Sequence, residues 1–438
     1  MKKYLNSKLK SSNLLEILYK SFHSFSFRVF GFAIGYVFVL IITRNLEAKG
    51  KGYYDIIYML AMLFSMFGKL GIDVSMNKWC GIYNGNNNTN YLKKIYFKSI
   101  SIALAGSVFL AFLLYVFRFS ISAYFKNEAL VHGINYIVFL LPFMAILDVN
   151  ASFFRGLKKI KLFGIYHQVG RFLFPTLVII ILLYKHELNY LSPVIALFFG
   201  VIVLSLLAFI HVLYYLNSLT ESKEISIPTV KNIVSVSFPM MYASSIIFIM
   251  GWIDTFIIGR LDTIDNVGIY ATSVKLAVAI SFIYNAVSNI TTPKIAEFYS
   301  LNQTAKINET IKFANRLNVY LAIPIFIVLF IFAEFTLGLF GKEFVEGIRV
   351  FRILLIFQLS NTFLGNVSAF MQMTGSQKTL QYFILIGLAL NVIISLTLYN
   401  SLGLIGVAIG TLIASITWRV LGIVYIYKHN NIKIWFQF

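Results

Sequence analysis

The chain has 438 residues, of which 59% are hydrophobic and only 12% are charged, and its formal net charge is +20. Soluble domains carry roughly 25% charged residues, so this composition excludes an ordinary soluble globule and indicates a surface that meets lipid. Basic cytoplasmic loops explain the positive charge of such a chain without a nucleic-acid partner. The one cysteine, Cys80, excludes an intramolecular disulfide and a cysteine zinc cluster.

Apolar runs long enough to cross a bilayer, about 20 residues each, recur along the whole chain. The runs are continuous rather than alternating, which excludes a β-barrel. The sequence therefore predicts an all-α integral membrane protein with about 12 transmembrane helices in two pseudo-symmetric six-helix bundles. The predicted helices span residues 22–44, 53–74, 96–118, 132–155, 162–184, 191–216, 233–260, 267–291, 315–340, 347–373, 378–399 and 402–427.

A polar segment that contains Pro228 divides the predicted helices into two sets of six. It gives an N-terminal lobe at 1–217, a cytoplasmic linker at 218–232 and a C-terminal lobe at 233–438. With a cytoplasmic N-terminus, 22 of the 37 basic residues fall in cytoplasmic loops and tails, nine fall outside and six lie within helices. Basic residues concentrate in cytoplasmic loops, so we expect both termini to be cytoplasmic.

An internal repeat supports the division into two sets of six helices. The chain has Arg44, then a glycine eight residues later and a tyrosine ten residues later, and it repeats this spacing from Arg260, 216 residues further on. An even number of helices in each half makes the repeats parallel, related by an axis along the membrane normal. The spacings Gly31-x-x-x-Gly35 and Gly406-x-x-x-Gly410 also predict close approach of neighbouring helices.

Ionisable residues occur inside the predicted helices, where each costs roughly 2.5–3.5 kcal/mol unless it faces protein or water. Basic residues outnumber acidic residues there, which leaves the interior net positive. The basic residues are Arg28, Lys69, Arg171, Lys275, Arg352 and Arg419, and the acids are Asp148, Asp254 and Glu334.

Three of these bases lie at the same predicted depth as an acid on the neighbouring helix. Structural ion pairs are one interpretation of all three matches, and groups that couple ions or gate transport are the other. The matched pairs are Asp148 with Arg171, Asp254 with Lys275, and Glu334 with Arg352.

The remaining ionisable positions are Arg28, Lys69, Arg419 and His167. Arg28 and Lys69 lie at matching depth near the cytoplasmic side, so they either face an anion or water between them or reach separately to the headgroups. Arg419 is expected to be a headgroup anchor near the inner end of the last helix. His167 lies one helical turn before Arg171 and is either a proton relay or a hydrogen-bonded structural residue.

The sequence lacks the motifs of the common membrane-associated enzymes. No Gly-x-x-x-x-Gly-Lys-Ser/Thr loop, His-Glu-x-x-His pair or zinc-finger spacing is present, so we expect no ATP hydrolysis, no metal and no other cofactor. The outer loops are too short to build the site of a membrane polysaccharide polymerase. A protein that is not an enzyme, and most simply a transporter, is predicted.

Several short motifs carry a resemblance that covers nearly the whole chain. The chain resembles Wzx-type polysaccharide flippases, members of the multidrug/oligosaccharidyl-lipid/polysaccharide exporter superfamily. The residues that carry it are Gly31 to Arg44, Gly52-Tyr-Tyr54, Gly71-Ile-Asp73, Ser237-Phe-Pro239, Asp254, Arg260, Gly268-Ile-Tyr270, Thr292-Pro293 and Leu402 to Ala408.

The resemblance implies two bundles that face a central cavity and rock between inward-open and outward-open states. It implies a substrate of undecaprenyl pyrophosphate carrying an oligosaccharide, transport driven by an ion gradient, and a place in the bacterial inner membrane. The pathway would be that of an O-antigen, lipopolysaccharide or capsule, with glycosyltransferases and a polymerase as neighbours. A multidrug or cation antiporter of the same superfamily and a polysaccharide polymerase stay as alternatives.

The net-positive interior suits an anionic pyrophosphate head, and this assigns roles to the interior charges. We expect the first group to contact pyrophosphate and the second to couple ions or gate transport. The first group is Arg28, Lys69, Arg171, Lys275 and Arg352, and the second is Asp148, His167, Asp254 and Glu334.

Overall fold

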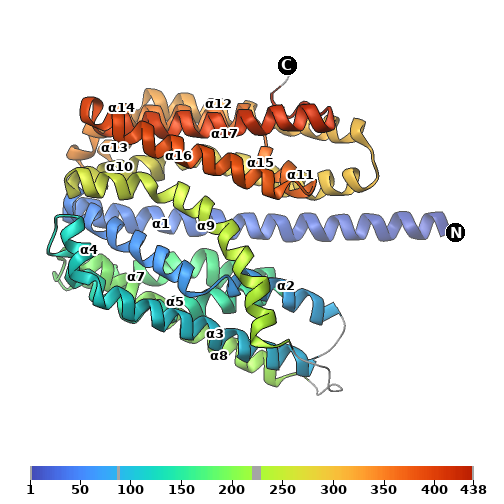
Figure 1. Ribbon diagram of the computed structural model, residues 1–438, viewed down its shortest axis with the longest axis horizontal. Coiled ribbons are helices and arrows are strands. Elements are labelled where there is room, and N and C mark those ends of the chain that lie inside the picture. Colours follow the sequence, from blue (N-terminus) through green and yellow to red (C-terminus); the bar gives the residue numbers. More distant parts are fainter. Residues whose placement is uncertain (1, 86–88, 220–227, 437–438) are drawn as a thin grey trace. The chain divides into compact units, whose positions relative to one another are not determined.

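The computed structural model describes residues 2–85, 89–219 and 228–436, and these ranges are built from helices joined by short turns (Figure 1). No β-strand occurs in the described ranges. Ten of the described helices are long and apolar enough to cross a membrane, or eleven if the bent pair Lys342–Phe363 and Val367–Met373 is one span. The prediction of an all-α membrane fold is confirmed.

Helix α1 (Lys2–Gly68) is 67 residues long and accounts for two predicted spans. Its backbone leaves helical geometry at Glu47, where φ is 57° and ψ is −168°. The kink lies between the predicted segments 22–44 and 53–74, and every other predicted segment overlaps a helix or the bent pair. The prediction of twelve spans therefore agrees with ten or eleven apolar helices once α1 is counted as two.

Contacts divide the chain into two compact units. Unit 1 comprises Met1–Leu46 and Tyr53–Ser245, and unit 2 comprises Glu47–Gly52 and Ile246–Phe438. The division falls inside a helix at Ser245, whereas the predicted linker is 218–232, of which residues 220–227 lie outside the described chain. The lobe bounds given by the sequence stay a prediction.

In unit 1 the most buried helix is α5, which packs against α2, α3 and α8. Glycines allow the helices to approach closely, because a Cβ on Gly31 would lie 2.2 Å from the Gln168 carbonyl oxygen. The helices after α1 are α2 (Ile72–Gly85), α3 (Thr89–Val116), α4 (Arg118–Tyr124), α5 (Leu130–Gly156), α6 (Ile160–Phe163), the π-helix η1 (Gly164–Val169), α7 (Gly170–Tyr184), α8 (Ser192–Asn217) and the first part of α9 (Val230–Leu261).

In unit 2 the last two helices form an antiparallel hairpin, and a Cβ on Gly406 would lie 2.6 Å from the Leu398 carbonyl. The close approach predicted for both glycine pairs is therefore confirmed. After α9 come α10 (Ile264–Ala277), η2 (Val278–Ile280), α11 (Ser281–Ser300), α12 (Thr304–Ile331), α13 (Ala333–Gly338), η3 (Lys342–Gly347), α14 (Ile348–Phe363), α15 (Val367–Met373), α16 (Gln377–Leu402) and α17 (Leu404–Asn430).

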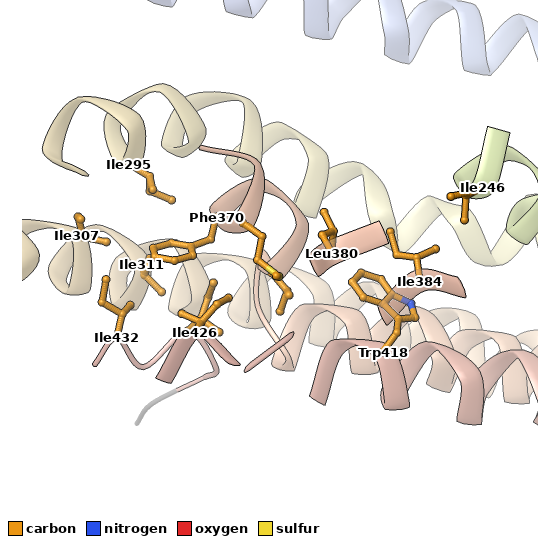
Figure 2. Close-up of a cluster of buried hydrophobic side chains, with 13 residues drawn as sticks. Ile246, Ile295, Ile307, Ile311, Phe370, Leu380, Ile384, Trp418, Ile426 and Ile432 are labelled. Carbon is orange, nitrogen blue, oxygen red and sulfur yellow. The ribbon is translucent and has the colours of Figure 1, made fainter. Parts of the chain in front are cut away.

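A cluster of buried apolar side chains joins the helices of unit 2 (Figure 2). It includes Ile432 and Ile434, which follow α17 and are each 1% exposed. The amide of Asn315 in α12 donates a hydrogen bond to the carbonyl oxygen of Ile434 at 2.6 Å. The segment after α17 is thus part of the core of this unit.

The glycines of the repeated motif pack against each other within unit 2. A Cβ on Gly52 would lie 1.8 Å from the carbonyl oxygen of Ile264, and one on Gly268 would lie 2.2 Å from that of Ala48. Each glycine also faces the backbone nitrogen of the other at 2.9 Å from the added Cβ. This reciprocal contact is the arrangement that two related motifs make across a local two-fold axis.

Candidate functional site

A cluster of four charged side chains lies inside unit 1. Lys69 Nζ donates to Asp73 at 3.0 Å and also contacts Asp148, whose other carboxylate oxygen contacts Arg171. Four elements position these groups: the turn after α1, the first turn of α2, the second half of α5 and the first turn of α7. Leu70 and Gly71 have φ of 52° and 74°, which bends the chain so that Lys69 and Asp73 meet.

This cluster is buried and its charges are balanced. The side chains of Lys69 and Asp148 are each 10% exposed, and that of Arg171 is 20% exposed. Buried charges are stable only when they are paired and hydrogen-bonded, and here two cations meet two carboxylates. The predicted Asp148–Arg171 pair is confirmed.

The two interpretations of Lys69, an anion or water shared with Arg28 or a reach to the headgroups, did not include protein carboxylates, but its amine contacts Asp73 and Asp148. The sequence analysis missed Asp73, although its position four residues after Lys69 is the helical spacing of an ion pair.

Next to the cluster, α7 begins with the π-helix η1, which contains His167. The His167 ring stacks on Phe163 with ring centroids 4.9 Å apart. Helix α1 crosses here, because Phe27 lies against Gly164, and the adjacent Arg28 is half-buried. The π-helix changes the register of the turn that joins His167 to Arg171, and such turns are frequent at functional sites.

A second buried carboxylate, Asp254 in α9, lies in unit 2 and is 8% exposed. Neutral side chains donate to it: the hydroxyl groups of Tyr270 at 2.6 Å and Thr411 at 2.5 Å, and the amide of Asn391 at 3.0 Å. The Asn391 oxygen accepts in turn from Ser395 at 2.8 Å. These hydrogen-bond donors come from α10, α16 and α17 and are all neutral, and the predicted partner Lys275 is not among them.

The third predicted pair does not form between these two described residues. Glu334 in α13 is exposed. The guanidinium of Arg352 in α14 lies over the Phe330 ring, 5.1 Å from its centroid. The depth match failed because α12 ends at Ile331 and a separate short helix carries Glu334.

A cavity of about 500 Å³ in unit 2 adjoins the Asp254 network. Asn391 and Thr411 take part in both, so the cavity reaches the groups that hold the carboxylate. Trp418 and Ile384, which both belong to the apolar cluster drawn in Figure 2, form an apolar part of its wall. Amide and hydroxyl side chains form most of the polar part: Asn285, Ser288, Asn366, Gln372, Asn391 and Thr411.

Arg419 also lines this cavity, which corrects its predicted role as a headgroup anchor. Its Nη1 donates to the carbonyl oxygen of Ser415 at 3.2 Å and contacts the Ser415 hydroxyl. Its guanidinium lies over the ring of Trp418, 4.2 Å from the centroid. The sequence placed Arg419 on the last helix but did not show which face it occupies.

Charged side chains inside membrane helices are costly, and where they occur they commonly mark the substrate and ion pathways of transporters. The family described as polysaccharide biosynthesis protein matches residues 17–298, which is more than half of the chain. The chain belongs to this family. A second family, described as MatE, matches residues 239–397.

Relatives of known name agree with this membership. The probable low-salt glycan biosynthesis flippase Agl15 of Haloferax volcanii is 26% identical over 190 residues, 42% of this chain. The match spans 40% of the length of that curated relative.

Solved structures share the fold at low sequence identity. The lipid II flippase MurJ, in an inward closed conformation, superposes with a TM-score of 0.71 at 16% identity and covers 93% of this chain and 87% of that chain. An inward-facing multidrug resistance MATE family transporter gives 0.70 at 16% identity, with 90% and 93% coverage. The resemblance to flippases of the multidrug/oligosaccharidyl-lipid/polysaccharide exporter superfamily is confirmed.

Proposed function

We propose that the protein flips oligosaccharides linked to undecaprenyl pyrophosphate from the cytoplasmic to the outer leaflet of a bacterial inner membrane. The observation that carries this proposal is the family match over residues 17–298. The glycan flippase among its relatives and the fold shared with a lipid II flippase support it. The motion would be alternating access, and both termini would be cytoplasmic.

The charge cluster of unit 1 supplies a contact for the pyrophosphate head. The carboxylates of Asp73 and Asp148 contact Lys69, and Asp148 also contacts Arg171. Phosphate oxygens would compete with these carboxylates, because arginine binds both anions through its planar fork. Arg28 would join them from α1, and Lys275 and Arg352 would receive the head in the other lobe.

Asp254 is the residue that we assign to ion coupling. A carboxylate held by neutral donors in an apolar interior favours a proton or a small cation, because an ionised carboxylate is costly there without a positive partner. The oxygens of Tyr270, Asn391 and Thr411 surround it and are ligands of the type that hard cations prefer. His167, Asp148 and Glu334 would act in gating.

A depletion experiment tests the assignment in cells. When the gene is repressed in its own host, lipid-linked repeat units should accumulate on the cytoplasmic leaflet and the surface polysaccharide should disappear. Glycosyltransferases and a polymerase would act before and after this step, on an O-antigen, lipopolysaccharide or capsule. Normal surface polymer in the depleted cells, with no second flippase present, would refute the proposal.

A multidrug antiporter is the second candidate, because the MATE family transporter superposes as well as MurJ does. A cation exporter favours acidic groups in its cavity, whereas the described lining of the unit 2 cavity carries Arg419 and no acid. Expression in a drug-sensitive strain separates the two functions. Raised resistance to organic cations without restored polysaccharide would favour the antiporter.

A further inference from the structure

The side chains that line the cavity of unit 2 suit a polar, negatively charged ligand. Among the described residues that line it, Arg419 carries the one permanent charge. The other polar groups are neutral amides and hydroxyls, which bind sugar hydroxyl groups as well as anions. A volume of about 500 Å³ lies in the range of small-molecule sites.

Two contacts fix the Arg419 side chain and leave several of its hydrogen-bond donors unused. Within the described chain, the hydrogen bonds of its guanidinium use one terminal nitrogen, Nη1, which Ser415 holds. The Trp418 ring supports the guanidinium at 4.2 Å from the centroid, as in a cation–π contact. Nη2 and Nε, which donate three more hydrogen bonds, stay available to the cavity that the side chain lines.

A track of hydrogen-bonded side chains extends the site along α11 and α15. Tyr284 donates to the Asn366 oxygen at 2.9 Å, and the Asn366 amide contacts the Ser288 hydroxyl. Ser288 lies 3.3 Å from the Thr292 hydroxyl. These four residues all line the cavity, so contacts among their side chains fix the orientation of its polar groups and lower the entropy cost of binding a ligand.

We propose that this cavity binds an oxyanion of the transported molecule on Arg419, either its pyrophosphate or a carboxylate of its sugars. The inference rests on the proposed flippase function and adds a substrate contact outside the set expected from the sequence. Thr411 and Arg419 are eight residues apart on α17, about 12 Å along the helix axis. Thr411 lines the cavity and donates to Asp254, so an anion at Arg419 and a cation or proton at Asp254 would lie close enough to favour each other's binding.

Binding of two probes to the purified full-length protein tests the site by calorimetric titration at constant ionic strength. Inorganic pyrophosphate represents the lipid head, and glucuronate represents an acidic sugar. We expect saturable binding of at least one probe. Preference for pyrophosphate assigns the site to the lipid head, and preference for glucuronate assigns it to the glycan.

Three variants and a control make the test specific. Arg419→Gln should weaken binding about tenfold or more, and Arg419→Lys should weaken it less, because the charge stays and the fork is lost. Gly251→Phe should abolish binding by filling the cavity, since a Cβ there meets nothing within 4 Å. Arg349→Gln removes an exposed charge from the same unit and should bind as the wild type does.

Two results would overturn the site: wild-type affinity in folded Arg419→Gln, or no saturable binding of either probe to the wild type. Lipid flipping is measured separately, so the two proposals fail independently. A protein that binds the anion at Arg419 but moves no lipid-linked glycan would contradict the proposed function alone.

Discussion

Asp148 and Asp254 are both buried carboxylates in apolar helices, 7% and 8% exposed, but their partners differ. Asp148 contacts two cations, and Asp254 accepts from two hydroxyl groups and an amide. A paired charge costs little to keep buried, whereas a carboxylate with neutral partners gains from binding a proton or cation. The first arrangement suits structure and gating, and the second suits ion coupling.

Asp254→Asn tests the second arrangement. The change removes the charge and keeps the shape, and the hydroxyl groups of Tyr270 and Thr411 can rotate to suit an amide. We expect the unfolding temperature in detergent to stay the same or rise while transport stops responding to the ion gradient. Asp265→Asn, an exposed acid on α10, is the matched control. Gradient-driven transport at the wild-type rate in Asp254→Asn would remove this residue from the coupling mechanism.

Asp148→Asn tests the first arrangement. Both Lys69 and Arg171 lose a carboxylate partner, and breaking a buried pair costs about 3–5 kcal/mol. We expect a lower unfolding midpoint than in Glu128→Gln, which removes an exposed acid from the same unit. Adding Arg171→Met should recover part of the loss, because Lys69 keeps Asp73 as a partner and the cation that lost its carboxylate is then gone. Additive losses in the double variant would contradict the pairing.

At the residue scale, the sequence predicted charged positions better than it predicted their partners. Matching depth on neighbouring helices paired Asp148 with Arg171 correctly. The same argument did not find the partners of Asp254, because they are a tyrosine on the next helix and an asparagine and a threonine on α16 and α17, none of them charged. Such neutral residues carry no signal in a search for charges. The face of α17 that carries Arg419 was equally hidden, since its partners Trp418 and Ser415 define it only after packing.

At the element scale, a helix break and close glycine contacts mark the bounds of the two units. Glu47 kinks α1, and the following segment through Gly52 belongs to unit 2 while both flanking parts belong to unit 1. The lengths of the apolar runs predicted the long apolar helices, because run length can be read directly from the sequence. The sequence predicted a break between 22–44 and 53–74, where the kink at Glu47 lies, but it did not predict the π-helix η1, which is a response to tertiary contacts.

Gly52→Ala and Gly268→Ala test the reciprocal contact of the repeated motif. Each added Cβ would meet a backbone oxygen, at 1.8 Å and 2.2 Å, and a backbone atom cannot move aside as a side chain can. We expect a loss of about 1–3 kcal/mol or more in the free energy of unfolding, measured by denaturant titration in detergent. Gly251→Ala, in open space on α9, should be neutral or slightly stabilising. Equal stability of all three variants would show that the contact does not form.

At the scale of the whole molecule, charge distribution and family agree on a transporter. The basic residues favour cytoplasmic termini, and the apolar helices fit a multi-pass chain. Reporter fusions after Lys185 and after Lys428 should therefore report opposite sides of the membrane. Topology would be revised if both fusions reported the same side.

Flipping by the purified protein in liposomes tests the central claim most directly. Fluorescent undecaprenyl-pyrophosphate-linked oligosaccharide is placed in both leaflets, and a membrane-impermeant quencher reports the fraction exposed outside. With a sodium or proton gradient imposed, the wild-type protein should raise quenching well above the protein-free level, which is about half of the label, and Asp254→Asn should not respond to the gradient. Quenching that stays at the protein-free level under both gradients, with folded wild-type protein present, would contradict the flippase assignment.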